Sequence, residues 1–180
     1  TAELARSLGV AAEKIRIVQP GVTLPNAPQS PAALQDFRRR HQLGNERLLL
    51  SVGRLTTRKG LREFVQQALP AIVQAAPDTL LVVVGDAPAD SLHASVQTRA
   101  SIQAVADAAG IGQHLRFLGV ITDPQELACA YESATLHIFP VRHLPGDPEG
   151  FGMVAIEAAA HGLPTVAFAT GGIVDAVAEG

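Results

Sequence analysis

The sequence predicts an α/β fold in which a parallel sheet is covered by helices on both faces. Five short apolar runs alternate with longer segments whose apolar residues have helical spacing. The runs are apolar at nearly every position, as strands buried on both faces are. Hydrophobic residues make up 47% of the 180-residue chain and charged residues 17%, which suits one domain with a large core and excludes a disordered chain. The predicted domain is therefore Rossmann-like.

The five predicted strands lie at residues 48–52, 80–84, 115–118, 136–139 and 165–168. Each of the first four ends at a residue that turns the chain: Gly53, Gly85, Gly119 or Pro140. Alternation of strand and helix gives right-handed crossovers and hence parallel pairing. With the usual strand order 3-2-1-4-5, the order reverses between the first and fourth strands, and ligands bind there beyond the carboxyl ends.

Helical segments fill the gaps at residues 60–76, 90–109, 123–133 and 153–160. The third opens with Asp123 as the N-cap and Pro124 at the first helical position. A last helix is predicted to begin at Asp175 with no strand after it, so the domain is expected to be incomplete at its C-terminus.

Residues 1–30 differ from the rest of the chain. They predict the end of a helix at residues 2–8, a short strand at 15–18 and a linker at 25–31 that holds three prolines. We expect residues 1–30 to be the tail of a preceding domain with its linker, and residues 31–180 to form the Rossmann-like domain.

Composition excludes several classes of protein. The net charge is −3 and the longest basic run is residues 38–40, which argues against nucleic acid as a partner. The single cysteine, Cys129, excludes an internal disulfide framework, fits a reducing compartment and is expected to be buried. No run of about 18 apolar residues predicts a membrane span. The histidines and acids show no metal-ligand spacing, so we expect no metal site.

Two unusual loops follow the first and fourth strands. The first holds Gly53, which permits a tight turn, and the cations Arg54 and Lys59 near the start of the next helix. Cations oppose the helix dipole there, unless a phosphate lies between them and the free helix N–H groups. A solvated basic turn explains the same residues, and the pattern alone leaves both interpretations open.

The second loop ends in Glu149, and Gly150 and Gly152 expose backbone N–H groups at the start of a helix. Glu157 lies inside that helix, which is apolar on nearly all sides, so its carboxylate is predicted to be buried and to need donors. Two sugar hydroxyls would supply them, and so would a neighbouring arginine or backbone N–H. Residues 150–155 also match the dinucleotide pattern G-x-G-x-x-A, which the long loop 140–148 disfavours.

Four other polar residues have simpler explanations. Asp123 could read a base edge but is explained by helix capping, and His137 on a buried strand is expected to be a satisfied core histidine. His161 lies where a helix C-terminus favours it, and His143 lies in the long loop with no spacing to support a ligand role.

The motifs resemble the C-terminal domain of the group 1 retaining glycosyltransferases, which have the GT-B fold. Residues 51–60 are similar to the family's G-R-L-x-x-x-K-G loop, residues 117–121 to F-L-G-x-V with Ile121 for the valine, and residues 149–157 to E-x7-E. Residues 170–173 resemble the next turn, and residues 15–22 the strand and P-G-V turn that close the N-terminal domain.

The resemblance implies a role for each matching residue. Arg54 and Lys59, with Gly53 in the same loop, would bind the diphosphate of a UDP-, GDP- or ADP-sugar and stabilise the leaving nucleotide. Glu149 would contact the transferred sugar, and Glu149, Arg54 and Lys59 would be the catalytic residues. Glu157 would bind the ribose hydroxyls, and backbone near Ile121 the base. Sugar and phosphate would meet the turn at Gly150 and the backbone N–H groups that the next residues provide: Phe151, Gly152, Met153 and Val154.

The resemblance implies a hexosyltransferase without cofactor or metal, in which a preceding domain binds a glycan or lipid acceptor. The enzyme is expected in the cytoplasm, and a peripheral contact with the inner face of a membrane stays open for it. The loop at residues 141–148 is longer than the family's shortest form and is similar to relatives that transfer mannose to lipids. Alone, the chain is expected to bind nucleotide weakly and to transfer nothing. The alternatives are an epimerase or phosphorylase of the same architecture, a non-catalytic nucleotide-binding module and a dinucleotide oxidoreductase domain.

Overall fold

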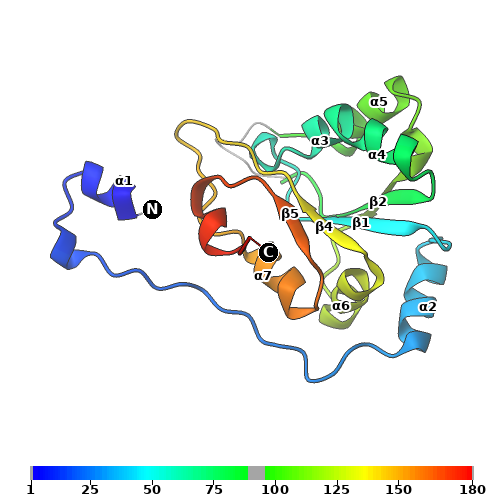
Figure 1. Ribbon diagram of the computed structural model, residues 1–180, viewed down its shortest axis with the longest axis horizontal. Coiled ribbons are helices and arrows are strands. Elements are labelled where there is room, and N and C mark those ends of the chain that lie inside the picture. The colour runs from blue at the N-terminus through cyan, green and yellow to red at the C-terminus, as the bar shows by residue number, and fades with distance from the viewer. Residues whose placement is uncertain (1, 89–95, 180) are drawn as a thin grey trace.

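The fold is described from a computed structural model of the chain, for residues 2–88 and 96–179. Five strands form one parallel sheet in the order β3-β2-β1-β4-β5, as the sequence predicts (Figure 1). Their bounds are β1 Arg47–Val52, β2 Thr79–Val84, β3 Leu115–Gly119, β4 Leu136–Phe139 and β5 Thr165–Ala167. The strand order reverses between β1 and β4, and this point defines where a ligand site is expected.

Helices cover both faces of the sheet (Figure 1). On one face lie α3 (Leu61–Gln67), α4 (Leu69–Ala75) and α5 (Arg99–Ala108), and on the other α2 (Pro31–Arg40), α6 (Pro124–Ser133) and α7 (Met153–Ala160). The remaining elements are α1 (Ala2–Ser7) and four short 3₁₀ turns, η1 (Ala12–Lys14), η2 (Thr57–Lys59), η3 (Gly112–His114) and η4 (Gly171–Asp175).

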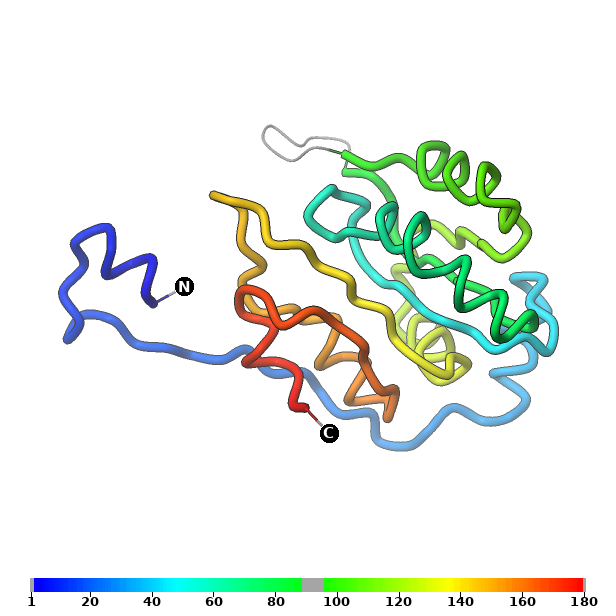
Figure 2. Tube along the Cα trace, turned by 45° about the horizontal axis from the view of Figure 1, so that its top comes forward, coloured from blue at the N-terminus to red at the C-terminus, as the bar shows by residue number. Residues whose placement is uncertain are grey.

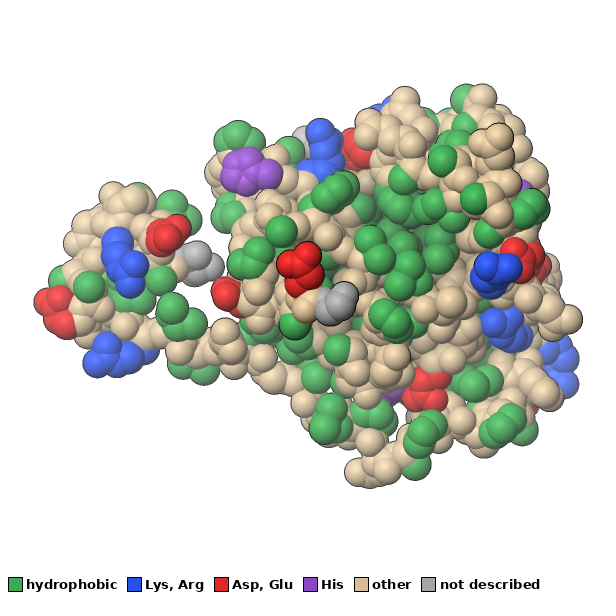
Figure 3. All heavy atoms as spheres, viewed as in Figure 1, with side chains coloured by type: hydrophobic (Ala, Val, Ile, Leu, Met, Phe, Trp, Pro, Cys, Tyr) green, Lys and Arg blue, Asp and Glu red, His purple; other side chains and the backbone are tan. Residues whose placement is uncertain are grey.

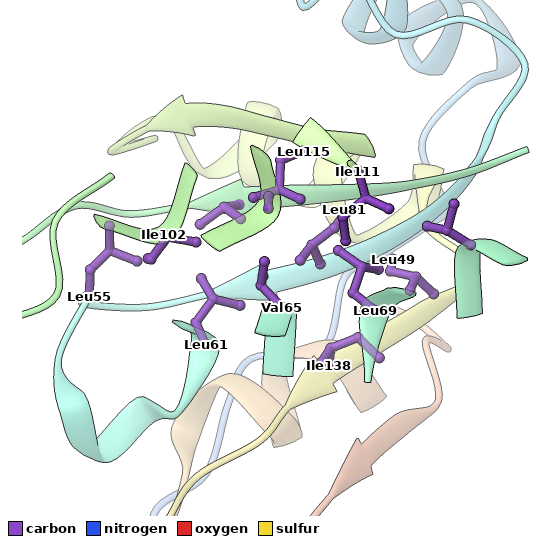
Figure 4. Packing of buried hydrophobic residues seen from close by; sticks show 13 residues of the cluster. Leu49, Leu55, Leu61, Val65, Leu69, Leu81, Ile102, Ile111, Leu115 and Ile138 are labelled. Carbon is purple, nitrogen blue, oxygen red and sulfur yellow. The ribbon is translucent and has the colours of Figure 1, made fainter. Parts of the chain in front are cut away.

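Alternate residues of the central strands enter two separate cores, because side chains of a strand point to opposite faces in turn. Leu49 of β1 packs with α3, α4 and α5, as Figure 4 shows, whereas Leu48 and Leu50 pack with Phe37 of α2 and Tyr131 of α6. A third, smaller cluster joins the end of β4 to α7 and η4; its buried members are Phe139, Val141, Ala155 and Ile173. This third cluster fixes the start of α7 against the carboxyl end of β4.

Two predicted helices have different bounds in the structure. The segment 60–76 is broken at Ala68 into α3 and α4, because Pro70 in the first turn of α4 lacks an N–H group and cannot continue the helix before it. The segment 90–109 becomes α5, which begins only at Arg99 after its N-cap Thr98, since Val96 forms an isolated bridge with Thr56 instead. Residues 90–95 of that prediction lie outside the described residues.

Helix α2 was not predicted, although its start carries two recognisable signals. Ser30 is the N-cap and its hydroxyl accepts a hydrogen bond from Ala33 N at 3.2 Å, and Pro31 occupies the first helical position. Because Ser30 and Pro31 lie in a proline-rich stretch, they were assigned to the predicted linker and the helix was missed.

Two predicted elements at the ends of the chain are wrong. Residues 15–18 form no strand: Ile17 and Val18 are 72% and 86% exposed, and no strand of the described chain pairs with them. An extended segment without a neighbouring strand has no ladder of hydrogen bonds. The helix expected from Asp175 does not form: the 3₁₀ turn η4 ends at that residue, and residues 176–179 are not helical.

The segment before α2 lies along the edge of the domain. In Figures 1 and 2 it runs from α1 past α7 and α6, and Gln29 N donates to Glu132 Oε2 of α6 at 2.6 Å. On the face seen in Figure 3, hydrophobic side chains gather over β4 and β5; Val166 of β5 and the nearby Phe168 are 54% and 64% exposed. No helix among the described residues is long and apolar enough to cross a bilayer.

Candidate functional site

The loops after β1 and β4 meet at the point where the strand order reverses. A small pocket there is lined from both loops, by Gly53, Arg54 and Lys59 on one side and Phe139 and Pro140 on the other. Gly53 has a φ of 140°, which L side chains rarely adopt, so the turn out of β1 favours glycine. The two unusual loops of the sequence therefore come together as predicted.

Gly60 holds these two loops in close contact. Its φ of 68° is left-handed, and a Cβ at this position would overlap the carbonyl oxygen of Pro140. The backbone N–H of Arg142 also donates to the carbonyl oxygen of Arg58 at 2.8 Å. Only a residue without a side chain permits this approach, which brings η2 against the loop after β4.

Lys59 and Glu149 form an ion pair across the two loops. Lys59 Nζ lies 2.8 Å from Glu149 Oε2 and 4.9 Å from the centre of the Phe139 ring. Their side chains are only 17% and 11% exposed. Burial lowers the pKa of Lys59, while the hydrogen bond and charge of Glu149 oppose that shift. The pair thus provides a cation and an anion that are both partly shielded from water.

Arg58 is a third member of this cluster, and the sequence analysis gave it no role. Its Nη1 lies 3.3 Å from Glu149 Oε2 and donates to the carbonyl oxygen of Pro148 at 3.1 Å. Its Nε lies 3.4 Å from Asp147 Oδ1, close enough for an ion pair but without hydrogen-bond geometry. The signal that could have identified it is its position beside Lys59 in a loop with three cations.

Arg54 differs from the other two cations because its side chain is exposed. Across the part of the chain that the structure describes, it has no recorded hydrogen bond or ion pair, and its charge contributes to the lowered pKa of Lys59. Arg54 therefore lies near Lys59 at the rim of the pocket with its guanidinium available to a ligand.

The start of α7 presents backbone N–H groups beside this cluster. Its N-cap is Gly152, with a left-handed φ of 91°, and no side chain caps the helix. Ala155 N is the first to bond back, to Gly152 O at 2.9 Å. Among the described residues no hydrogen bond is recorded for the N–H groups of Met153 and Val154, as expected for a first helical turn.

Gly150 and Phe151 precede that turn and border a second cleft. Its other walls come from residues 15–20 and from Gly171 and Gly172. Gly172 N donates to the carbonyl oxygen of Glu149 at 2.9 Å, and a Cβ on Gly172 would overlap the carbonyl oxygen of Gly150. The turn before η4 thus supports the backbone that carries Glu149.

Glu157 is half-buried rather than buried, because α7 exposes part of its surface. The hydroxyl of Tyr131 donates to Glu157 Oε2 at 2.9 Å, a donor that the sequence analysis did not consider. The Tyr131 ring stacks on His161 with centroids 5.4 Å apart, and burial raises the pKa of Tyr131 with help from the charge of Glu157. No recorded contact within the described ranges joins Glu157 to Arg54, Lys59 or Glu149, so their common ligand site stays a prediction.

Ile121 follows β3, two strands away from β1 at the same edge of the sheet. Its side chain is partly buried and packs against the core of α2 and α6, whereas the neighbouring Val120 is 66% exposed. The structure thus places Ile121 at the carboxyl end of β3, and the contact of its backbone with a base, which the resemblance implies, stays a prediction.

The simpler explanations hold for most of the other polar residues. Asp123 caps α6 by accepting from Gln125 N at 3.1 Å, Cys129 is buried, and His161 is the C-cap residue of α7. His137 is fully buried with Nδ1 3.1 Å from Thr165 Oγ1, and burial lowers its pKa to about 4. Its Nε2 is buried and has no hydrogen-bond partner among the described residues, so only one of the two ring nitrogens is hydrogen-bonded as expected for a core histidine.

Comparison with known families gives one extended match. The sequence profile of the family "Glycosyl transferases group 1" matches residues 35–180. The chain is 32% identical, over 163 residues, to a GDP-mannose-dependent alpha-(1-6)-phosphatidylinositol monomannoside mannosyltransferase of Mycolicibacterium smegmatis. It is 33% identical, over 171 residues, to a D-inositol 3-phosphate glycosyltransferase of Segniliparus rotundus.

These matches span most of the chain but less than half of each relative. They include 89% and 93% of the chain and 40% and 34% of the two relatives. Among solved structures, HepE from Anabaena in complex with UDP-glucose superposes with a TM-score of 0.80 at 21% identity, over 99% of this chain and 45% of that one. At this identity the likeness shows the fold.

Proposed function

Because the chain belongs to the group 1 glycosyl transferases, we propose that it forms the nucleotide-sugar-binding half of a retaining hexosyltransferase. Its parallel α/β fold matches that of GT-B glycosyltransferases. The observation that carries the proposal is the cluster at the strand-order reversal: Lys59 beside Glu149, with Arg54 exposed at the rim of the same pocket. A diphosphate is the ligand that such cations and a free helix N-terminus bind well.

In this proposal each part of the donor has its own partner. The diphosphate lies between Arg54, Lys59 and the N–H groups at the start of α7. Glu149 accepts from hydroxyls of the hexose through Oε1, for which no partner is recorded among the described residues. The ribose hydroxyls bind Glu157, and the base lies against backbone near Ile121.

The reaction breaks the bond between the hexose C1 and the diphosphate oxygen and forms a bond between C1 and an acceptor oxygen. The nucleoside diphosphate leaves with the electron pair of the broken bond, and its departing oxygen takes the proton that the acceptor hydroxyl loses. Arg54 and Lys59 stabilise the charge that develops on the leaving diphosphate, which lowers the barrier because they are in place beforehand. The anomeric configuration is retained.

The relatives support the proposed classes of donor and acceptor. They include a GDP-mannose-dependent mannosyltransferase, and a structural neighbour is a UDP-glucose complex, so the proposed donor is a nucleoside diphosphate hexose. Residues 1–30 belong to the end of a preceding domain, which binds a glycan or lipid acceptor. The second cleft supports this part of the proposal, because residues 15–20 and Gly150 line it together.

A donor screen on the complete protein tests the proposal. Isothermal titration calorimetry with UDP, GDP, ADP and NAD should show one nucleoside diphosphate bound best, and Lys59→Ala should weaken it by about tenfold or more, the effect of losing a charge-assisted hydrogen bond. Arg47→Ala, at the opposite edge of the sheet, is the matched control. NMR of the product should show a retained anomeric centre. Preference for NAD over all three diphosphates would contradict the proposal.

A further inference from the structure

Arg58 contacts three consecutive residues of the loop after β4. Its guanidinium faces Asp147, Pro148 and Glu149, at 3.4, 3.1 and 3.3 Å. Its carbonyl oxygen accepts from the backbone of Arg142 at the beginning of the same loop. The side chain is only 13% exposed although it is charged. Arg58 therefore links η2 to both ends of this loop.

Arg58 and Lys59 share a single carboxylate oxygen, Glu149 Oε2, at 3.3 and 2.8 Å. Lys59 has no other recorded polar partner within the described residues and only the face of Phe139 nearby. A lysine is a point charge on a flexible stem, whereas the planar guanidinium of arginine holds several acceptors in fixed positions. Lys59 can thus leave Glu149 for another anion, while Arg58 is held by the loop.

The pairing of Lys59 with Glu149 conflicts with donor binding. In the proposed function Lys59 binds the diphosphate, whereas Glu149 binds the hexose. If Lys59 turns to the diphosphate, Glu149 loses its closest cation. A carboxylate that is 11% exposed is costly to leave without a partner. Arg58 removes this cost, because it stays beside Glu149 when Lys59 departs. The two cations therefore have different tasks.

We propose that Arg58 is a positioning residue: it holds Glu149 in place for the hexose when Lys59 moves to the donor diphosphate. The inference rests on the proposed function, in which Lys59 binds phosphate and Glu149 binds the sugar. It assigns Arg58 to recognition of the hexose and not of the nucleotide. Loss of Arg58 should then weaken binding of the whole nucleotide sugar but leave binding of the nucleoside diphosphate unchanged.

Calorimetry on the complete protein separates these contributions. The probes are GDP with GDP-mannose and UDP with UDP-glucose, and the informative pair is the one that the wild type binds. Arg58→Ala should weaken the nucleotide sugar by about tenfold and the diphosphate by less than about twofold, since only the sugar contact loses its support. Lys59→Ala should weaken both ligands. Arg47→Ala, a second arginine in an ion pair, is the control and should change neither.

Arg58→Lys provides the second variant. It keeps a cation beside Glu149 but cannot hold Pro148 and Asp147 at once, so the nucleotide sugar should bind with an affinity between those of Arg58→Ala and the wild type. A melting temperature close to that of Arg47→Ala shows that each variant is folded. In a transfer assay, Arg58→Ala should raise the KM for the donor and lower kcat, because a misplaced Glu149 impairs the transition state too.

The outcomes distinguish this inference from the proposed function. Equal weakening of diphosphate and nucleotide sugar in folded Arg58→Ala would overturn the inference, because Arg58 would then bind phosphate or act only on the fold. Unchanged binding of both ligands would also overturn it. If Lys59→Ala left the affinity of both ligands unchanged as well, the proposed function would fail with it.

Discussion

Removal of the Glu157 carboxylate tests whether this acid binds the ribose of the donor. The experiment combines Glu157→Ala in the complete protein with a nucleoside diphosphate that lacks both ribose hydroxyls, the 2′,3′-dideoxy form. Each change alone removes the proposed contact, and both together remove nothing further. The four affinities therefore form a cycle that isolates the contact between acid and ribose.

The magnitude follows from the environment of the carboxylate. Glu157 is half-buried and already accepts one hydrogen bond from Tyr131 at 2.9 Å, which fixes the orientation of the side chain. Hydrogen bonds from hydroxyls to such a charged acceptor contribute about 1.5–3 kcal/mol in all. The dissociation constant should therefore rise by about tenfold to 150-fold in either single change. The bond to Tyr131 is lost from the free and bound states alike, so it affects stability more than affinity.

The assay is calorimetric titration of the wild type, Glu157→Ala and the control Asp78→Ala with both ligands. Asp78 is an acid at the opposite edge of the sheet, in an exposed ion pair with Arg47. We expect the wild type and the control to lose affinity for the dideoxy ligand, and Glu157→Ala to bind both ligands equally and weakly. If folded Glu157→Ala still discriminated between the ligands as the wild type does, the ribose role of Glu157 would be refuted.

Three further predictions follow from particular groups. His137, with a pKa lowered to about 4, takes up its proton in the unfolded chain first, so stability should fall between pH 6.5 and 4 by about 3 kcal/mol. Denaturant unfolding measured across this pH range should show a smaller fall in the free energy of unfolding for His137→Gln than for the wild type. Lys59 has a lowered pKa when free, and a bound diphosphate should raise it. Binding should therefore take up protons, and the affinity should start to fall at an alkaline pH that lies below 10.5. Calorimetric titrations in buffers of different ionisation enthalpy would measure the proton uptake, which Lys59→Arg should abolish. Gly172→Ala should destabilise the protein by about 1–3 kcal/mol in thermal unfolding and weaken the nucleotide sugar, because its Cβ would overlap Gly150 O; Gly21→Ala, which meets no atom within 4 Å, should be neutral.

The sheet could be predicted from the sequence because its signals are local. Runs such as residues 80–84 are apolar at every position, and each is buried in the structure, so hydrophobic pattern alone identifies the strand. The strand order also agreed with the prediction, since crossover handedness and short connections leave few alternatives. Helix breaks are harder to predict from the sequence. The break at Ala68 was missed because the apolar spacing of residues 60–76 is continuous, although Pro70 indicates a break.

The strand predicted at residues 15–18 was wrong for a reason that no local pattern contains. A β-branched run has strand propensity, but a strand exists only where another strand pairs with it. Ile17 and Val18 find no such partner in the described chain and remain exposed. The same limit applies to Glu157, whose donor Tyr131 lies 26 residues away in the sequence, so no spacing could have identified the contact.

The site was predictable in position but not in its pairings. The reversal of strand order and the two unusual loops point to the candidate site, whereas no sequence pattern ranks the three cations of one loop. The structure ranks them by exposure: Arg54 is exposed, and Lys59 and Arg58 are 17% and 13% exposed beside one acid. Arg54 and Lys59 were predicted from their place at the start of a helix and from the family motif, and the contacts add Arg58.

Under the proposed function, this ranking accounts for a loop that binds a dianionic ligand and keeps its structure without it. Three cations around a free pocket would repel one another, and burial of an uncompensated charge is costly. Glu149 pairs with two of them through a single oxygen and Asp147 lies beside Arg58, while Arg54 stays in water. In the proposed function, a diphosphate replaces Glu149 as the partner of Lys59 and supplies a partner to Arg54. Asp147 and Glu149 leave one of the three positive charges unbalanced in the free site, and in this proposal the donor diphosphate offsets it while Arg58, the cation that need not move, keeps Glu149 in place in both states.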